Sequence, residues 1–427
     1  MFKQKSLILG LAATMLAGGL SACNQAAADL TYWCTSVDND VMVKIVDAFK
    51  KDNPQYAEKR IELGANYGEG DAYTNLSKSL ANAGDVIFVA DDNIRSGVDS
   101  RLLTDLSEDK DAFVQSDGQF AVNACSVDGK MYAYPYRSDN SPMPFYDKAT
   151  FASNPAALNS LEGMLDACEK AGKKFYLDIA NGWYNAFMVW AAGANFTVGT
   201  GKKGTEVILH DIVAKKNQVG EVLKALKALY NRYQDTWEVS SDNGIIQDAF
   251  GNETAGVAFL WNDGVAIKAK TSREVGVAQW PTLAVSGQNV ALKCFQSYKA
   301  IVCKRQDDTE RLALAKAFAK YCASYKAQEM RLELDYGPSN LELMQTAQVN
   351  ALEFPNAIKQ MNNAGRTVDQ ATNVTGAFWT PMGDLGGMVS NGLGNLDDGA
   401  WGAYPTAAAA AAGSVAIDGW EAHTFSA

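Results

Sequence analysis

Residues 128–148 read DGKMYAYPYRSDNSPMPFYDK, a stretch that joins two aromatic strands through a polar segment. The Asp-Gly pair at its start is a turn signal, and the tyrosines and phenylalanine that follow favour β-strands. Between the two strands lies RSDNSP, residues 137–142, which has no large apolar side chain. This pattern predicts either a hairpin loop within one domain or a crossing between two separate cores.

Before this stretch, the chain alternates between strands and helices. LTYWCT, IELGAN and DVIFVA read as strands, and the last has the composition of a strand buried on both faces of a parallel sheet. One helix is predicted to end before Pro54, and a second is predicted from a cap at Asp71 to a stop at Gly84. Strand, helix, strand, helix, strand is a βαβαβ unit, and ligands of such sheets bind beyond the carboxyl ends of the strands.

The same alternation resumes after residue 148. Apolar residues spaced three and four apart predict helices over SLEGMLDACEKAGK, over VGEVLKALKALYNRY and, from a Thr309 cap, over TERLALAKAFAKYCASYKAQEMRL. The predicted strands of this part are KKFYLDIA, TAGVAFLWNDG, EVGVAQWPT and ALKCFQSYKAIVC. Two such units in a chain of 427 residues predict an α/β fold with more than one domain.

The N-terminus has the pattern of an export signal. Two lysines precede an apolar run that ends near Leu20, and small residues lead from there to Cys23. The sequence LSAC resembles a bacterial lipobox, in which the cysteine is lipidated; the alternative is an ordinary signal peptide cut at a nearby alanine. We therefore expect a signal peptide over residues 1–22, lipidation at Cys23 and a lipid-anchored linker over residues 23–29, which would hold the protein to the membrane.

Charge and composition argue against several other classes of protein. The formal net charge is −11 and no basic cluster offsets it, so we expect no nucleic-acid partner. Only His210 and His423 occur, and the cysteines lack CxxC spacing, so we expect no metal and no cofactor. The motifs of phosphate-binding loops, zinc proteases, serine hydrolases and dinucleotide sites are absent. The six cysteines after Cys23 are expected to be mostly free, buried thiols.

The order of the short motifs carries a resemblance to a known family. After the βαβαβ unit come DGKMYAYP, FYDK, TAGVAFLWNDG, GVAQWPT, LAKAF and AFW. In this order they resemble the extracellular solute-binding proteins of ABC transporters, above all the maltose and multiple-sugar branch, up to about Gly387. The resemblance implies an α/β, periplasmic-binding-protein-like fold with two α/β lobes joined by hinge crossings.

The resemblance also implies a domain organisation. Residues 137–142 would be a hinge crossing over the ligand cleft, which has to be polar because it is exposed when the lobes are open. The N-terminal lobe would comprise residues 30–136 and 295–335, and the C-terminal lobe residues 140–291 and 338–427. Closure of two lobes about such hinges is a known way to enclose a ligand.

Five candidate ligand-binding residues lie in the N-terminal lobe. Asp92 matches an acidic residue that follows the third strand in the family, and Asp91 stands beside it; either could instead cap a helix. Asp38 and Asn39 are expected in the first loop, where helix capping explains them equally well. Glu69, in NYGEGD, is a further candidate.

The hinge and the C-terminal lobe supply the other candidates. Asp139 matches a hinge acid that contacts ligand; the alternative is an ion pair with Arg137 or plain solvation. Trp379 matches a residue that stacks on a sugar ring, with a core position as the alternative. The candidates in NGWYN, WNDG and AFW are Trp183, Tyr184, Trp261, Asn262, Asp263 and Trp379.

The resemblance implies a binding protein rather than an enzyme. It would be an extracytoplasmic, membrane-anchored monomer that captures a sugar or oligosaccharide in the cleft and delivers it to an ABC permease. Aromatic rings beside Asp and Asn suit such a ligand, since rings pack on sugar CH faces and the polar groups bind hydroxyls. Val89 and Gly182 replace an aromatic residue and an acid of the maltose-binding branch, which indicates a different glycan. Alternatives are a polyamine or other small-solute receptor of the same fold and, less favoured, a surface glycan hydrolase.

Overall fold

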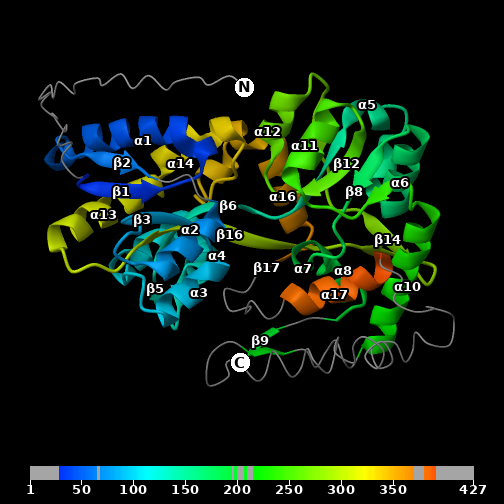
Figure 1. The fold of residues 1–427 in the computed structure, drawn as a ribbon, viewed down its shortest axis with the longest axis horizontal. Helices are drawn as coiled ribbons and strands as arrows, with labels where there is room; N and C mark the ends of the chain where they lie inside the picture. Colours follow the sequence, from blue (N-terminus) through cyan, green and yellow to red (C-terminus); the bar gives the residue numbers. More distant parts are fainter. Residues whose placement is uncertain are drawn as a thin grey trace, which may run out of the picture.

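The computed structural model shows two α/β lobes side by side, here called the N-lobe and the C-lobe (Figure 1). Each lobe has its own sheet and its own hydrophobic core, so the predicted two-lobed α/β fold is confirmed. The structure describes residues 28–64, 68–194, 197–199, 206–208, 215–369 and 379–390.

The predicted N-terminal signals lie almost wholly outside the described residues. This applies to the signal peptide over residues 1–22, to Cys23 and to the linker as far as residue 27. Within the described ranges, none of the helices is both long enough and apolar enough to cross a bilayer.

The sheet of the N-lobe is mixed. β1 pairs in parallel with β2 and with β3, as expected for the predicted βαβαβ unit. β16 instead runs antiparallel to both β3 and β6, so the buried β3 does not belong to a purely parallel sheet. The strands are β1 (Leu30–Trp33), β2 (Ile61–Leu63), β3 (Val86–Ala90), β6 (Ala133–Asn140), β16 (Cys294–Cys303) and β17 (Thr367–Asp369).

The helices of the N-lobe cover this sheet, as Figure 1 shows in blue, cyan and yellow. They are α1 (Asn39–Asp52), α2 (Glu69–Lys78), α3 (Asp92–Asp99), α4 (Lys110–Ala124), α13 (Thr309–Cys322) and α14 (Tyr325–Met330). In α1, the predicted apolar stripe is buried: Met42, Ile45 and Phe49 are all inaccessible to solvent.

Two predicted helices have different boundaries. α2 begins at Glu69 after the extended Gly68 and ends at Lys78, so Asp71 lies inside the helix and does not cap it. The long helix predicted from Thr309 is two helices, because Ser324 caps a new one after α13 has ended. The cap of α13 is Asp308, whose carboxylate accepts hydrogen bonds from the first free backbone N–H groups of the helix.

The C-lobe has a five-stranded sheet in the order β11, β8, β12, β7, β13. Its central strand, β12, is buried along its whole length, parallel to β8 and antiparallel to β7. The strands are β7 (Met143–Asp147), β8 (Lys174–Tyr176), β11 (Trp237–Glu238), β12 (Ala255–Leu260) and β13 (Val275–Val277). The helices are α5 (Lys148–Phe151), α6 (Leu161–Lys170), α7 (Gly182–Asn185), α8 (Phe187–Ala191), α10 (Lys216–Arg232), α11 (Asn243–Gly251), α12 (Gly264–Lys270), α15 (Ala347–Asn350), α16 (Glu353–Asn363) and α17 (Trp379–Ser390).

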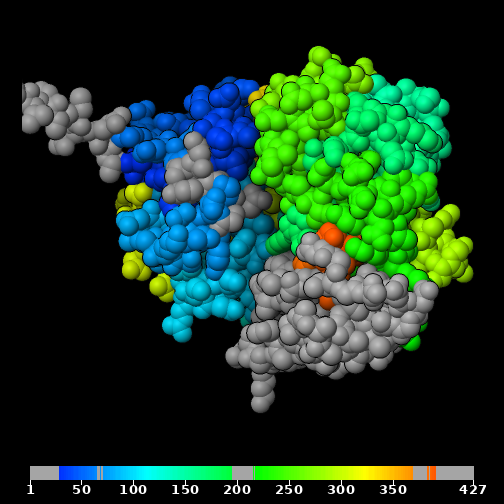
Figure 2. Space-filling model, turned by 45° about the vertical axis from the view of Figure 1, so that its right-hand side comes forward, coloured from blue at the N-terminus to red at the C-terminus, as the bar shows by residue number. Residues whose placement is uncertain are grey.

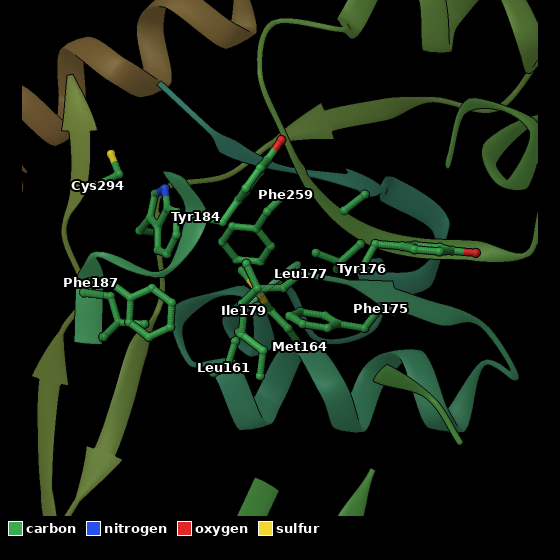
Figure 3. Packing of buried hydrophobic residues seen from close by; sticks show 14 of the residues in the cluster. Leu161, Met164, Phe175, Tyr176, Leu177, Ile179, Tyr184, Phe187, Phe259 and Cys294 are labelled. Atoms are coloured by element: carbon green, nitrogen blue, oxygen red, sulfur yellow. The ribbon is translucent and has the colours of Figure 1, made fainter. Parts of the chain in front are cut away.

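The core of the C-lobe lies between this sheet and its helices (Figure 3). Leu161 and Met164 of α6 pack there with Phe175 of β8 and Phe259 of β12. Tyr184 stands at the margin of this cluster, with its hydroxyl pointing away from Leu161 and Met164 (Figure 3). The core therefore holds the ring of Tyr184 in place, while the hydroxyl of Tyr184 lies outside this apolar cluster.

Within the described residues, three segments pass between the lobes. β6 ends at Asn140 in the N-lobe sheet and β7 begins at Met143 in the C-lobe sheet, so only two residues separate strands of different sheets. β16 is the second crossing, since its first residues join the C-lobe core and its last residues join the N-lobe core. The third runs from the short 3-10 helix η5 (Arg331–Leu334) to α16.

The part of the chain that the structure describes also contains three two-stranded hairpins. They are β4 (Ser126–Val127) with β5 (Lys130–Met131), β9 (Thr197–Gly199) with β10 (Glu206–Ile208), and β14 (Thr282–Val285) with β15 (Gln288–Ala291). Asp128 and Gly129 both have positive φ in the first of these, as the Asp-Gly turn signal predicts.

All six cysteines in the described ranges are buried and free, as the sequence predicts; they are Cys34, Cys125, Cys168, Cys294, Cys303 and Cys322.

Candidate functional site

The expected ligand-binding residues follow the carboxyl ends of strands in both lobes. Asp38 lies after β1 and Asp91 directly after β3 in the N-lobe, whereas Trp261 directly follows β12 and Trp183 lies in α7 beyond β8 in the C-lobe. In open α/β sheets this edge carries the ligand site. Figure 2 shows the blue N-lobe and the green C-lobe meeting along a boundary on the face in view.

Three aromatic candidates form one cluster in the C-lobe. The ring of Trp261 lies 6.2 Å from that of Trp183, at 78°, and 6.0 Å from that of Tyr184, at 66°. These are edge-to-face contacts, in which the positive edge of one ring meets the negative face of another. Tyr184 is buried and both tryptophans are half-buried, so the cluster is fixed but keeps exposed indole surface.

Local structure positions these rings. The side chain of Asn181 caps α7 by accepting a hydrogen bond from the Trp183 N–H over 3.1 Å. The Asn185 amide at the end of α7 donates to the Ile179 carbonyl over 2.9 Å, which ties the short helix to the loop before it. Trp261 is positioned by strand β12, which is fully buried and directly precedes it.

Carboxylates lie beside the aromatic cluster. Asp263 accepts a hydrogen bond from the Gln247 amide over 2.8 Å, and burial raises the pKa of its carboxyl. Asp178, which the sequence analysis did not select, accepts from the Ser241 hydroxyl over 2.7 Å. Burial raises the pKa of Tyr184, and the charges of Asp178 and Asp263 raise it further, so both carboxylates lie near its phenol. The C-lobe thus places hydrogen-bond acceptors next to flat apolar rings.

A lysine that the sequence analysis missed lies opposite this cluster. Lys299 is on β16, is 8% exposed and places its ammonium 5.9 Å from the centre of the Trp261 ring. Its charge also acts to lower the pKa of Asp91, so Lys299 lies between an acid of the N-lobe and an aromatic ring of the C-lobe. The strand was predicted, but only the pairing of β16 with β6, in which Lys299 faces Arg137, decides where this side chain lies.

Asp91, the residue before α3, does not cap this helix with its side chain. Asp91 is fully buried, and its carboxylate accepts from the Tyr298 N–H over 2.9 Å instead. Burial raises its pKa well above the ordinary value, and the neighbouring charge of Asp92 adds to the rise. Asp92 is half-buried and accepts from the side-chain amide of Asn93 over 3.1 Å.

Asp139 forms the ion pair that was the alternative to ligand contact. Its carboxylate accepts from the Arg137 guanidinium over 2.7 and 3.1 Å, from the Asn262 amide over 3.0 Å and from the Gly337 N–H over 2.8 Å. The Asn262 amide also donates to the Asp335 carbonyl over 2.7 Å. Asp139 and Asn262, two expected ligand contacts, are therefore bonded to each other and join two crossings to the end of β12.

The other four candidates lie at the starts of helices α1, α2 and α17. Asp38 is fully buried at the N-cap position of α1 but makes no side-chain cap bond, and Asn39 accepts a hydrogen bond from the Cys34 thiol. Glu69 and Trp379 are the first residues of α2 and α17, and their side chains are outside the described part of the structure. α17 packs against α7, so the backbone of Trp379 begins a helix next to the aromatic cluster (Figure 1).

No metal site emerges from the described ranges, where no three His, Cys, Asp or Glu side chains gather closely enough to hold an ion.

Comparison with known proteins identifies the family of this chain. Residues 44–356 match the family model described as bacterial extracellular solute-binding protein, which is well over half of the chain. No curated protein sequence shows significant similarity. The resemblance inferred from the order of the motifs is thereby confirmed.

Solved structures give the same fold. The maltodextrin binding protein MalE1 from L. casei BL23 has a TM-score of 0.72 at 16% identity, covering 93% of this chain and 99% of that chain. The maltose-maltodextrin binding protein of Alicyclobacillus acidocaldarius has a TM-score of 0.70 at 16% identity, covering 85% and 95%. MalX from Streptococcus pneumoniae, solved with maltopentaose, has a TM-score of 0.69 at 18% identity, covering 85% and 95%.

Proposed function

Because the chain belongs to the bacterial extracellular solute-binding protein family, we propose that it captures a sugar or oligosaccharide between its lobes and delivers it to an ABC permease. The observation that carries this proposal is the cluster of Trp183, Tyr184 and Trp261. Its half-buried indoles offer flat apolar surface, and Asp178 and Asp263 beside it accept hydrogen bonds. That combination matches a sugar ring, whose CH faces pack on aromatic rings and whose hydroxyls bind polar groups.

The ligand would bind first to the C-lobe and then be enclosed. The aromatic cluster belongs to the C-lobe, and Val89, where the resemblance leads one to expect an aromatic residue in the N-lobe, is an aliphatic residue that is 2% exposed in β3. The N-lobe would contribute polar contacts from the loops after β1 and β3 and from Lys299. A ligand that touches both lobes binds the closed form more tightly and shifts the equilibrium toward closure by that difference in free energy. In this mechanism the protein binds and releases its ligand without altering it.

Export and anchoring complete the proposal. The lipobox-like LSAC would place a lipid on Cys23, and few residues separate Cys23 from the first strand at Leu30. The protein would then act as an extracytoplasmic monomer held close to the membrane that contains its permease.

We propose a neutral glycan as the ligand. MalX is solved with maltopentaose, which makes linear α-glucans the first probes. The carboxylates of Asp178 and Asp263 lie beside the aromatic cluster, and they disfavour an anionic saccharide by repulsion.

Titration calorimetry on residues 24–427 with maltotriose and maltopentaose tests the proposal. We expect stoichiometric binding, weakened about tenfold or more in Trp261→Ala through loss of ring stacking. Phe120→Ala is the matched control, because Phe120 is an exposed aromatic residue of α4, 61% accessible, and its loss should leave the affinity unchanged.

Two further measurements separate the alternatives. If calorimetry detects binding of spermidine and of no glycan, the ligand is a polyamine and not a sugar. The acidic side chains of the site would then bind the polyamine. Chromatography of maltopentaose after prolonged incubation should return it intact; shorter products would indicate a hydrolase.

A further inference from the structure

Asn262 directly follows Trp261, and its side chain reaches out of the C-lobe to two crossings. The side-chain amide donates to the Asp139 carboxylate over 3.0 Å and to the Asp335 carbonyl over 2.7 Å. Trp261 itself follows β12, the central strand of the C-lobe sheet, and packs against the core of that lobe. A ring of the aromatic cluster is therefore joined by one peptide bond to a side chain that is held outside its own lobe.

The acceptors of these two hydrogen bonds are attached to the N-lobe. Asp139 is 2% exposed and lies in β6, which pairs with β16 in the N-lobe sheet. The third crossing is bound to the same strand. The Ser138 N–H donates to the Gly337 carbonyl over 3.0 Å, the Ser138 hydroxyl donates to the Pro338 carbonyl over 2.7 Å, and the Gly337 N–H donates to Asp139 over 2.8 Å. Asn262 thus ties the C-lobe to the N-lobe sheet by way of both crossings.

Two further groups of the C-lobe approach Asp335. The ammonium of Lys268 in α12 lies 3.3 Å from the Asp335 carboxylate. α12 begins at Gly264, where a Cβ would also lie 3.3 Å from that carboxylate. Asp335 has a φ of 61°, a left-handed conformation that is unfavourable for a residue other than glycine and persists where its surroundings hold it. The end of β12 and the start of α12 therefore pack closely against the third crossing.

An N-lobe strand approaches the ring of Trp261. Lys299 of β16 places its ammonium 5.9 Å from the centre of this ring. In the N-lobe sheet Lys299 is paired with Ala90, the last residue of β3, after which the ligand edge of that sheet begins. The spacing between the aromatic cluster and this edge determines which group of a ligand can lie between them. Because Trp261 cannot shift without its neighbour, the contacts of Asn262 set that spacing.

We propose that Asn262 is a positioning residue that holds the aromatic cluster of the C-lobe at a fixed spacing from the ligand edge of the N-lobe. It acts through Asp139 and Asp335 and does not touch the ligand, so Asn262 and Asp139 take a role other than the ligand contact that the sequence analysis expected. The functional part of this inference rests on the proposed function, because the spacing matters for binding only if a ligand enters between the lobes. The positioning of the lobes can be tested without any ligand.

Distances between spin labels test the positioning in the ligand-free protein, residues 24–427. Val43→Cys in α1 and Ile245→Cys in α11 place one label on each lobe, at positions that are 52% and 59% exposed. The native cysteines of the described ranges are buried, so they should stay unlabelled. In Asn262→Ala, double electron–electron resonance should give a clearly broader distribution of distances, because the lobes lose a shared contact. Asn289→Ala, at an exposed asparagine of β15, is the matched control and should leave the distribution unchanged.

A merely structural role of Asn262 would give a different result. If Asn262→Ala lowers the melting temperature and leaves the distribution of distances unchanged, Asn262 stabilises only its own turn and the proposal is overturned. Asn262→Ser, whose side chain is too short to reach both acceptors, serves if Asn262→Ala does not fold and should broaden the distribution likewise. Trp261→Ala leaves the Asn262 amide in place, so its distribution should match that of the unaltered protein. Equal broadening in Trp261→Ala would show that ring packing holds the lobes, which would also overturn the proposal.

Maltotriose titration then links the spacing to binding. If the unaltered protein binds maltotriose, Asn262→Ala should bind it about tenfold more weakly although every ring of the aromatic cluster remains, because the lobes are no longer preorganised for a ligand that contacts both. Asn289→Ala should bind it with full affinity. Equal affinity in Asn262→Ala and in the unaltered protein would overturn the functional part of the inference. Absence of binding to the unaltered protein would instead count against the proposed ligand, and the label distances would still decide the positioning role.

Discussion

Asn262 donates a hydrogen bond from its side-chain amide to the Asp139 carboxylate over 3.0 Å. The two residues come from different elements, since Asn262 lies beyond β12 and Asp139 lies in the first crossing. The same amide donates to the Asp335 carbonyl in the third crossing, and Arg137 and Gly337 complete the set of donors to Asp139. The first and third crossings are therefore held to the C-lobe by one polar network, whose hydrogen bonds can strengthen one another.

Asn262→Asp should destabilise the protein by about 2 kcal/mol more than Asn262→Ala at pH 7, because it sets a second carboxylate against Asp139. The repulsion raises the pKa of the introduced carboxyl above its unfolded value, so the penalty is present above that raised pKa and is lost as the pH falls through it. Urea unfolding of both variants at pH 7 and pH 5 measures this. A difference between the variants that does not shrink at pH 5 would contradict the role assigned to Asn262.

Gly337→Ala should disturb the same network. A Cβ at this position would lie 2.8 Å from the Cβ of Asp139, closer than two such atoms approach in proteins. Asp139 cannot move easily, because its carboxylate is held by Arg137, Asn262 and Gly337 itself. We expect a loss of about 1–3 kcal/mol in unfolding free energy. A melting curve that matches that of the unaltered protein would show that the backbone of the third crossing can shift to accommodate the added Cβ.

Asp147 anchors the C-lobe through a second buried network. Its carboxylate, at the end of β7, accepts from Arg273 over 2.9 and 3.1 Å, from Lys173 over 2.6 Å and from the Thr150 hydroxyl over 2.6 Å. These hydrogen bonds outweigh burial and hold the pKa of Asp147 well below its usual range. Asp147→Asn leaves Lys173 without its counter-charge and Arg273 with Glu253 alone, and should cost about 3 kcal/mol at pH 7.

The pH dependence of this effect has a definite sign. A carboxyl whose folded pKa is depressed contributes stability above its unfolded pKa of about 3.9, and that stability is lost as the pH falls toward the folded value. The difference in melting temperature between the unaltered protein and Asp147→Asn should therefore be full at pH 6 and shrink below about pH 4. Asp111→Asn, at an exposed position of α4, is the control and should show little difference at either pH.

The buried thiols should be unreactive in the folded protein. Burial raises the pKa of Cys168, Cys294 and Cys303 to about 12, so the nucleophilic thiolate is scarce at pH 8 and alkylating reagents cannot reach the sulfur. Mass spectrometry after iodoacetamide treatment of residues 24–427 should find these three cysteines unmodified in buffer and alkylated in urea. Rapid alkylation of any of them in buffer would show local opening of the core around it.

Short-range patterns in the sequence were enough for most elements of the fold. The apolar spacing along α1 predicted the face that is buried, the composition of β3 predicted a strand buried on both faces, and TAGVAFLWNDG predicted the strand β12. Boundaries were less accurate where two neighbouring residues compete for one role: at α13 the side chain of Asp308 caps the helix and that of Thr309 does not. Such choices differ by little in free energy and depend on the local path of the chain.

By itself, the sequence determined the alternating α/β architecture, because periodicity and composition act over a few residues. The aromatic candidates of NGWYN and WNDG and the polar crossing between two lobes followed from the resemblance to the family. Only the tertiary structure decided that Asp139 and Asn262 bond to each other and that Lys299 lies opposite Trp261. The physical reason is that hydrogen bonds and charges act through space. Their partners come from segments far apart in the chain, and strand register and burial, which no local pattern specifies, decide which of them meet.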